Sequence, residues 1–209
     1  MPAVKANVSY KLARYLFTFI QVVAMSLDKI SSQLTKHSQT KEKKLPPIES
    51  WNPPYCGEID LQIKSNGDWY YGGTIFKRLS LVKLLASVLL KEVTAEDETY
   101  FLVTPVEKIK ITVDDAPFVL TQWKWFDETK DKMVVSTNLD DEFTLDSDHP
   151  LTVTPTGEIY VNVRRNLLAK VHRNVYYQWV DLAKEVKTDK GTELQFISAD
   201  HVFSLGCIE

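Results

Sequence analysis

Residues 57–63 read Gly-Glu-Ile-Asp-Leu-Gln-Ile, and residues 157–163 read Gly-Glu-Ile-Tyr-Val-Asn-Val, an offset of 157 − 57 = 100 residues. Apolar residues alternate with polar ones in both segments, which is the period-two pattern of a half-buried β-strand. The correspondence continues along the chain, for example from Phe76 to Tyr176. A repeat over this distance predicts two related lobes, and the space between such lobes is a natural place for a ligand.

The segments that follow the two copies are similar in their order. After the first copy, a turn at Asn66-Gly67 predicts a returning strand over 69–76, and leucines at helical spacing predict a helix over 80–91. After the second copy, the pattern predicts a strand over 168–176 and a helix around 178–186. Further short strands follow in each half. The chain is therefore predicted to have an α+β fold of two related lobes, each with mainly antiparallel sheet and one helix.

The N-terminal part precedes both lobes. Apolar residues recur at spacings of three and four from Leu12 to Leu34, which predicts an N-terminal helix, and a polar, proline-ended linker follows. The predicted division is residues 1–44 for helix and linker, 45–126 for the first lobe and 127–209 for the second.

The nature of residues 1–24 stays open. The uncharged run from Tyr15 to Leu27 has 28 − 14 − 1 = 13 residues, fewer than the ~20 that span a bilayer, so no transmembrane span is expected. The run is compatible with a signal peptide, and a start at Met25 would make the preceding residues an annotation artefact. A cytoplasmic protein is the favoured interpretation.

Composition excludes some partners and leaves others open. The 209 residues are 44% hydrophobic and 25% charged, with a net charge of −3 and a pI near 5.9. A nucleic-acid surface needs concentrated positive charge, so nucleic acid is not an expected partner, whereas a protein partner stays open. Two isolated cysteines, Cys56 and Cys207, are more typical of reduced core residues than of a disulfide.

Patterns typical of catalysis or of a resident cofactor are missing from the sequence. It contains no GxGxxG, P-loop, HExxH, CxxC or GxSxG pattern, and its four histidines are dispersed. No cofactor and no metal site are predicted. The acidic residues between Asp140 and Asp148 are better explained as solvated turns than as cation ligands.

Arginines are the strongest candidates for binding chemistry. Arg165 shares the parity of the apolar residues in its predicted strand, and Arg173 does the same in the next one. Arg78 lies at the predicted strand-to-helix junction. A guanidinium on the apolar side of a strand needs an anionic partner, either a ligand phosphate or carboxylate or an acidic side chain of the other lobe. Trp69 and Tyr176 could stack on a ligand ring, although aromatic residues in sheets more often build core.

Several ordered motifs resemble a known family. They include Gly67-Asp-Trp69, Arg78 with Leu81-Val-Lys-Leu-Leu-Ala86, Leu102-Val-Thr-Pro-Val-Glu107, Asp115-Ala-Pro-Phe118, Thr137-Asn138, Asp148-His-Pro-Leu151, Arg165, Arg173 and Tyr176-Tyr177. Together they resemble the proteobacterial family catalogued as domain of unknown function 1285 (DUF1285), over roughly residues 45–206.

The resemblance implies a duplicated α+β core and a pleckstrin-homology-like C-terminal lobe. It also implies a groove between the lobes for a nucleotide-like ligand, and a role in signalling. The residues expected to line that groove are Trp69, Arg78, Thr104, Thr137, Asn138, Arg165 and Arg173, to which the aromatic argument adds Tyr176. The chain departs from the family pattern at Phe76-Lys77 and in its C-terminal strands, where the ligand contacts are least transferable.

Three functional hypotheses follow. The favoured one is a non-enzymatic ligand-binding or signalling protein that holds a small anionic, nucleotide-like molecule between its lobes and shifts their relative position. The second is a hydrolase or transferase acting on a phosphorylated metabolite, with His172 and Thr104 as candidate catalytic groups. The third is a protein-interaction adaptor.

Overall fold

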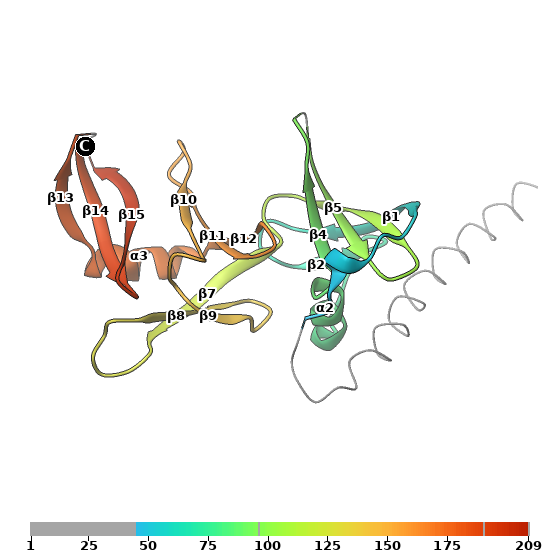
Figure 1. Ribbon diagram of the computed structural model, residues 1–209, viewed down its shortest axis with the longest axis horizontal. Coiled ribbons are helices and arrows are strands. Elements are labelled where there is room, and N and C mark those ends of the chain that lie inside the picture. Colours follow the sequence, from blue (N-terminus) through green and yellow to red (C-terminus); the bar gives the residue numbers. More distant parts are fainter. Residues whose placement is uncertain (1–44, 96, 190, 209) are drawn as a thin grey trace, which may run out of the picture.

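The computed structural model describes residues 45–208, apart from residues 96 and 190. The N-terminal helix predicted within residues 1–44, and the alternative signal peptide, lie outside the described residues. The molecule is elongated, with the first sheet and α2 at one end, a second sheet in the middle and a third sheet at the other end (Figure 1). Within the described part of the chain, no helix is long and apolar enough to cross a membrane.

The first lobe is a six-stranded sheet with one helix. Its strand order is β3-β2-β1-β6-β5-β4, in which only the β1–β6 pair is parallel. The elements are η1 (Ile48–Ser50), β1 (Tyr55–Ile63), β2 (Trp69–Tyr71), β3 (Thr74–Ile75), α2 (Leu79–Ala86), β4 (Leu89–Val93), β5 (Glu98–Val103) and β6 (Lys108–Val113).

The second lobe contains two sheets and one helix. The larger sheet has the order β10-β11-β12-β7-β8-β9 with a parallel β12–β7 pair, and β13-β14-β15 form a small antiparallel sheet. The elements are β7 (Phe118–Trp125), β8 (Met133–Thr137), β9 (Glu142–Thr144), β10 (Leu151–Val153), β11 (Ile159–Arg164), β12 (Leu167–Val171), α3 (Arg173–Leu182), β13 (Lys184–Thr188), β14 (Gly191–Ser198) and β15 (His201–Ile208).

The predicted α+β class and the related lobes are confirmed. In each lobe a hairpin (β1–β2 or β11–β12) leads into a helix and then into an antiparallel three-strand meander. The two meanders differ in how they are connected to the hairpins. In the first lobe β6 pairs with β1, so the meander belongs to the same sheet, whereas β13–β15 form a separate sheet. The expected division at residue 126 would put β7 in the first lobe, yet β7 pairs with β12 and β8 of the second sheet.

Four predicted segments have different boundaries in the structure. The strand expected over 69–76 is divided by a turn at residues 72–73 into β2 and β3. The helix expected over 80–91 ends at Ala86, and the last leucines of that run belong to β4, because a short apolar run fits a helix or a strand equally well. The strand expected over 168–176 ends at Val171, and the helix expected around 178–186 already begins at Arg173. His172 Nδ1 caps this helix by accepting from Asn174 N at 3.3 Å, a role that histidine seldom has in N-cap statistics.

The third sheet is attached to the rest of the second lobe by aromatic packing. The Trp179 ring of α3 lies 5.2 Å from that of Phe196, which in turn stacks 5.5 Å from Phe203. Ser198 Oγ adds two buried hydrogen bonds, donating to Leu145 O at 2.6 Å and accepting from Met133 N at 2.9 Å. The small sheet therefore extends the same core.

Candidate functional site

The two lobes meet through the turns of the duplicated hairpins. The β1–β2 turn includes Gly67, and the β11–β12 turn consists of Arg165-Asn166, at the positions predicted by the 100-residue offset. Arg165 and Asn166 have φ of +50° and +59°, as a two-residue type I′ hairpin requires. Non-glycine residues are held in this region only where other contacts compensate for the strain. For Arg165 those contacts come from the first lobe.

Arg165 is a structural link between three segments. Its Nε donates to Glu49, its Nη1 donates to Ser87 O at 3.1 Å and its Nη2 donates to Pro46 O at 2.6 Å. The side chain is only 15% exposed, whereas the Glu49 side chain is 60% exposed. Each of its three nitrogens therefore has a partner within the protein, which is the ion-pair alternative of the sequence analysis.

Arg164 reinforces the same contact. Its Nη1 pairs with Asp141 at 2.7 Å, its Nη2 donates to Ala86 O at 3.3 Å, and its guanidinium carbon lies 4.8 Å from the centre of the Phe118 ring. Ala86 ends α2, so two guanidinium groups of the second lobe lie at the carbonyl end of a first-lobe helix, where positive charge is stabilising. We call this pair of residues, Arg164 and Arg165, the arginine clamp.

The contact between the β1–β2 turn and the second lobe depends on a glycine. Asn138 Oδ1 accepts from Val119 N at 3.0 Å, and Asn138 Nδ2 donates to Gly67 O at 3.2 Å across the lobe boundary. A Cβ atom on Gly67 would lie 2.5 Å from Asn138 Nδ2 and 3.0 Å from Val119 Cγ2, and Gly67 has φ of +84°. Close approach and backbone conformation both require glycine here.

A hollow of about 390 Å³ lies beside this contact, on β7, β8 and the turn before β9. This volume is within the range of small-molecule sites. Gln122, Ser136 and Glu142 are paired neighbours on the three strands, so they form one row on one face of the sheet. The residues that line the hollow are Thr121, Gln122, Trp123, Lys124, Ser136, Thr137, Asn138, Asp140 and Glu142.

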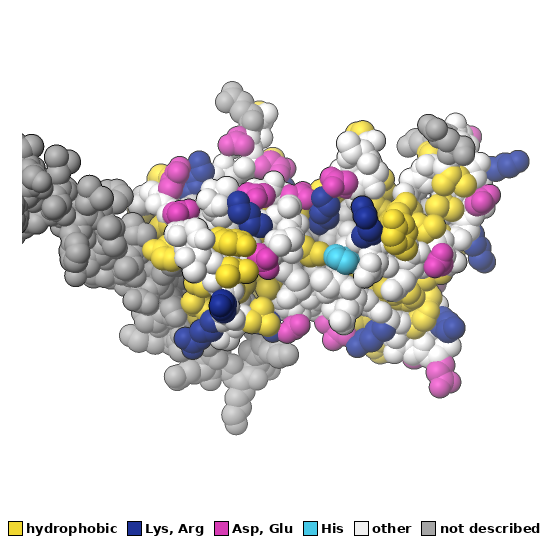
Figure 2. All heavy atoms as spheres, turned by 180° about the vertical axis from the view of Figure 1, so that it is seen from behind, with side chains coloured by type: hydrophobic (Ala, Val, Ile, Leu, Met, Phe, Trp, Pro, Cys, Tyr) yellow, Lys and Arg dark blue, Asp and Glu magenta, His cyan; other side chains and the backbone are white. Residues whose placement is uncertain are grey.

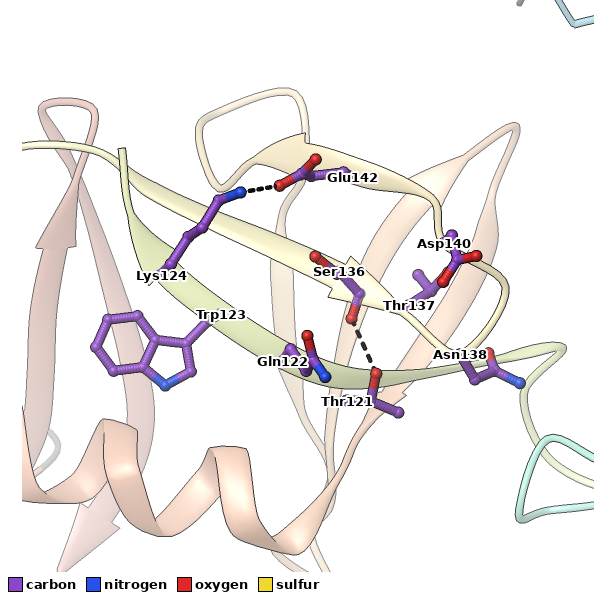
Figure 3. A pocket seen from close by; sticks show the side chains of 9 residues that line it. All are labelled: Thr121, Gln122, Trp123, Lys124, Ser136, Thr137, Asn138, Asp140 and Glu142. Carbon is purple, nitrogen blue, oxygen red and sulfur yellow. Dashed lines mark hydrogen bonds and ion pairs between the residues drawn. The ribbon is translucent and has the colours of Figure 1, made fainter. Parts of the chain in front are cut away.

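A β-bulge shapes one wall of the hollow. The register between β7 and β8 shifts between Leu120 and Gln122, which leaves Thr121 as the additional residue, and its hydroxyl lies 3.5 Å from Ser136 O. Figure 3 shows Lys124 reaching towards Glu142 on one side of the strands, while Trp123 points away from them towards a helix. Trp123 Nε1 donates to Gln178 of α3 at 2.7 Å, so its ring does not lie in the row formed by Gln122 and its neighbours.

Each carboxylate of the hollow is paired with a lysine. Lys124 pairs with Glu142 at 2.5 Å, and Asp140 pairs with Lys83 of α2. Basic and acidic side chains are also interspersed over the described surface that Figure 2 shows. Among the described residues, no group of three or more His, Cys, Asp or Glu side chains could hold a metal ion.

The linker between the lobes is anchored to the second sheet. Asp115 accepts from Tyr160 Oη at 2.7 Å and from Lys170 Nζ at 2.8 Å, and Lys170 also pairs with Glu158. Burial and the hydrogen bond to Asp115 raise the pKa of Tyr160 to about 12. Hydrogen bonds to Asp115 and Glu158 raise the pKa of Lys170 above its usual value. Protonated Tyr160 and Lys170 therefore hold the linker against the second sheet through Asp115.

The structure distributes the eight predicted site residues over different places. Thr137 and Asn138 line the hollow, whereas Arg165 belongs to the arginine clamp. Trp69 is buried in the core, and Thr104 is fully buried in the β5–β6 turn.

The remaining three predicted residues belong to helices or their caps. Arg78 precedes α2 and Arg173 is the first residue of α3; both are exposed, and no ion pair with another described residue involves either side chain. The prediction that Arg173 lies on the apolar face of a strand is therefore wrong, because Arg173 is an exposed residue of a helix. Tyr176 is half-buried on α3, with its ring 5.6 Å from that of Tyr177.

Comparisons with known proteins agree with the duplicated architecture. The family model for the DUF1285 N-terminal domain, a domain of unknown function, matches residues 46–116. The family model for the DUF1285 C-terminal domain matches residues 117–205. The chain belongs to the DUF1285 family. The two models meet between β6 and β7, and they confirm the family expected from the sequence motifs.

Two solved structures are similar to this chain. A DUF1285 family protein from Silicibacter pomeroyi DSS-3 is 30% identical with a TM-score of 0.68, over 84% of this chain and 95% of that chain. One from Shewanella baltica OS155 is also 30% identical, over 58% of this chain and 90% of that chain, with a TM-score of 0.48. No curated protein matches.

Sequence reasoning missed most of the hollow. The missed side chains are Thr121, Gln122, Trp123, Lys124, Ser136, Asp140 and Glu142. The alternation Gln122-Trp-Lys-Trp125 is a usable signal, because it makes one face of that half of the strand polar. The alignment of three such faces into one row depends on strand register, which the sequence does not display. The cysteines also differ from expectation, since Cys56 and Cys207 form no disulfide but are exposed rather than buried in the core.

Proposed function

We propose that this DUF1285 protein is a non-catalytic binding protein for a small polar molecule held in the hollow on β7 and β8. The observation that carries the proposal is the row of Gln122, Ser136 and Glu142 beside the bulge at Thr121. Amide, hydroxyl and carboxylate groups at fixed spacing on a sheet provide both donors and acceptors. A rigid array of this kind suits a ligand with several polar groups.

The charge of the lining supports an uncharged ligand. Glu142 is paired with Lys124 and Asp140 with Lys83, so the hollow offers a phosphate no unpaired cation among its described charged groups. The anionic, nucleotide-like ligand of the sequence hypothesis depended on Arg165, whose three nitrogens have partners in the protein. A sugar, a polyol or a nucleoside matches the hollow better than their phosphorylated forms.

The enzymatic alternative has less support. Thr104 is fully buried, and its hydroxyl accepts from Glu107 N at 3.1 Å within its own turn. His172 caps α3 through its ring nitrogen. Neither group belongs to the lining of the hollow.

A second candidate function, the adaptor, is supported by one observation. Ile197 and Val202 lie opposite each other near the tip of the β14–β15 hairpin and are 61% and 52% exposed. An exposed apolar pair on a sheet suits a protein contact. A protein that is pulled down from the source cells by the wild-type chain but not by Ile197→Ser would support this role.

A binding screen with matched ligands tests the main proposal. Adenosine, glucose and inositol should raise the melting temperature and give saturable ligand-observed NMR signals, and AMP or glucose 6-phosphate should give weaker ones. Ser136→Ala and Gln122→Ala should abolish the response. Thr144→Ala, a hydroxyl deletion on the neighbouring strand β9 but outside the hollow, is the matched control. Binding that survives the double variant, or binding of the phosphorylated compounds alone, would refute the proposal.

A further inference from the structure

The turn between β8 and β9, residues 137–141, is held in one conformation by its own hydrogen bonds. Thr137 N donates to Asp141 O at 2.9 Å, and Thr137 Oγ1 accepts from Leu139 N and Asp141 N at 3.3 and 3.2 Å. Asp140 has φ of +61°, a left-handed conformation that surrounding contacts must maintain. A displacement of one of these residues therefore changes the conformation of the whole turn.

Three side chains of this turn reach towards the first lobe by different routes. Asn138 donates to Gly67 O, and Asp140 pairs with Lys83 of α2. Asp141 pairs with Arg164, which donates in turn to the last carbonyl of α2. The first two contacts cross the lobe boundary directly, and the third crosses it through the arginine clamp.

The same turn forms one wall of the hollow. Thr137, Asn138 and Asp140 are all among its lining residues. Two of these side chains, Asn138 and Asp140, are thus both within reach of a ligand and in contact with the first lobe. Asn138 has no spare space on the other side, because its Nδ2 lies only 2.5 Å from the position of a Cβ on Gly67.

We propose that the turn 137–141 couples occupancy of the hollow to the arrangement of the two lobes. The inference rests on the proposed function, because the coupled ligand is the neutral polar molecule of the hollow. A ligand that turns the Asn138 amide or the Asp140 carboxylate into the hollow weakens its bond to Gly67 O or Lys83. It therefore favours an arrangement in which these lobe contacts are open.

Coupling of this kind is reciprocal, so loosening the lobe contact strengthens ligand binding. Lys83→Ala removes the partner of Asp140 from the first-lobe side and leaves the lining of the hollow unchanged. An exposed ion pair changes an equilibrium constant by about 1.5- to 5-fold. We expect adenosine to bind Lys83→Ala tighter than wild type by this factor.

The two cysteines of the chain allow the lobe arrangement to be measured. Cys56 lies on β1 of the first lobe and Cys207 on β15 of the second, and both are exposed. Spin labels on these residues report the distance between the lobes by electron–electron double resonance. Ser136→Tyr places a permanent ring in the hollow. Asp140→Asn removes the charge that pairs with Lys83, and asparagine tolerates the positive φ of this position. Thr144→Tyr is the control for adding the same ring outside the hollow.

We expect Ser136→Tyr, Asp140→Asn and added adenosine each to shift wild-type distances to longer values, and Thr144→Tyr to leave them unchanged. The coupling is overturned if Ser136→Tyr keeps the wild-type distances, whether or not Asp140→Asn shifts them. It is also overturned if adenosine binds with the same affinity to wild type and Lys83→Ala. If Ser136→Tyr shifts the distances but no neutral probe binds, the coupling stands and the proposed ligand class is wrong.

Discussion

Replacement of Arg165 by alanine separates the structural role of the arginine clamp from a ligand-binding role. The substitution removes hydrogen bonds to two main-chain carbonyls, Ser87 O and Pro46 O, and the ion pair with Glu49. Each carbonyl bond to a charged donor stabilises by about 1.5–3 kcal/mol, and a pair with an exposed carboxylate by about 0.2–1 kcal/mol. The alanine retains the strained backbone of the turn. Arg165→Ala should therefore lower the free energy of unfolding by about 3–7 kcal/mol.

Urea unfolding monitored by tryptophan fluorescence measures this loss. Glu49→Gln should cost less than about 1 kcal/mol, since it removes only the exposed charge. Arg173→Ala, which removes an exposed guanidinium, should stay within about 0.5 kcal/mol of wild type. If Arg165→Ala is as stable as Arg173→Ala, the clamp does not hold the lobes, and Arg165 is available for a ligand after all.

Two further predictions concern the lobe contact and its linker. Gly67→Ala should destabilise the protein by about 2–4 kcal/mol, because its Cβ would clash with Asn138, whereas Gly72→Ala, with open space around its Cβ, should cost only about 1 kcal/mol of backbone strain; equal losses in urea unfolding would contradict the close approach. Burial and the bond to Asp115 raise the pKa of Tyr160 to about 12 from 10.0, so its contribution is complete below pH 10 and is lost as pH rises towards 12. Tyr160→Phe should therefore lose less stability than wild type between pH 9 and pH 11, and parallel pH profiles would refute this assignment.

The period-two pattern was enough to predict the lobes because strands with one buried face show their burial directly in sequence. Prediction failed where a segment lacked that contrast. The run after Arg78 contains leucines on nearly every side, so it could not show that the helix ends at Ala86 and that a strand begins at Leu89. The helix at Arg173 starts on a histidine cap, for which the sequence has no strong signal.

The candidate site illustrates a second limit. Arg165 lies in the turn after β11 and not on the strand face assumed for it, and its partner Glu49 is 116 residues away in sequence. No local spacing can identify such a contact. The hollow depends on a further long-range property, the register that aligns Gln122 with Ser136 and Ser136 with Glu142. Local patterns predict which residues need a neighbour, and only the assembled sheets determine which neighbour it is.

The two hairpin turns carry different residues because each turn contacts different groups of the other lobe. Arg164-Arg165 of the second copy stands where the first copy has Lys64-Ser65, and Gly67 stands where the second has Leu167. Each turn docks onto the other lobe, but their surroundings differ: one meets the carbonyl end of α2, and the other meets the Asn138 amide at close range. Guanidinium groups fit the first environment, and only glycine fits the second.

The divergence of the copies therefore follows from the lobe contact and does not require a ligand at the arginines. The side chains left to bind a ligand are those beside the contact, on β7, β8 and the turn 137–141. Because that turn both lines the hollow and contacts the first lobe, a ligand there acts on the lobe arrangement from outside the interface. A chain that keeps the arginine clamp but loses Gln122 and Ser136 should stay folded and lose binding. That combination would not be expected if the clamp were the binding site.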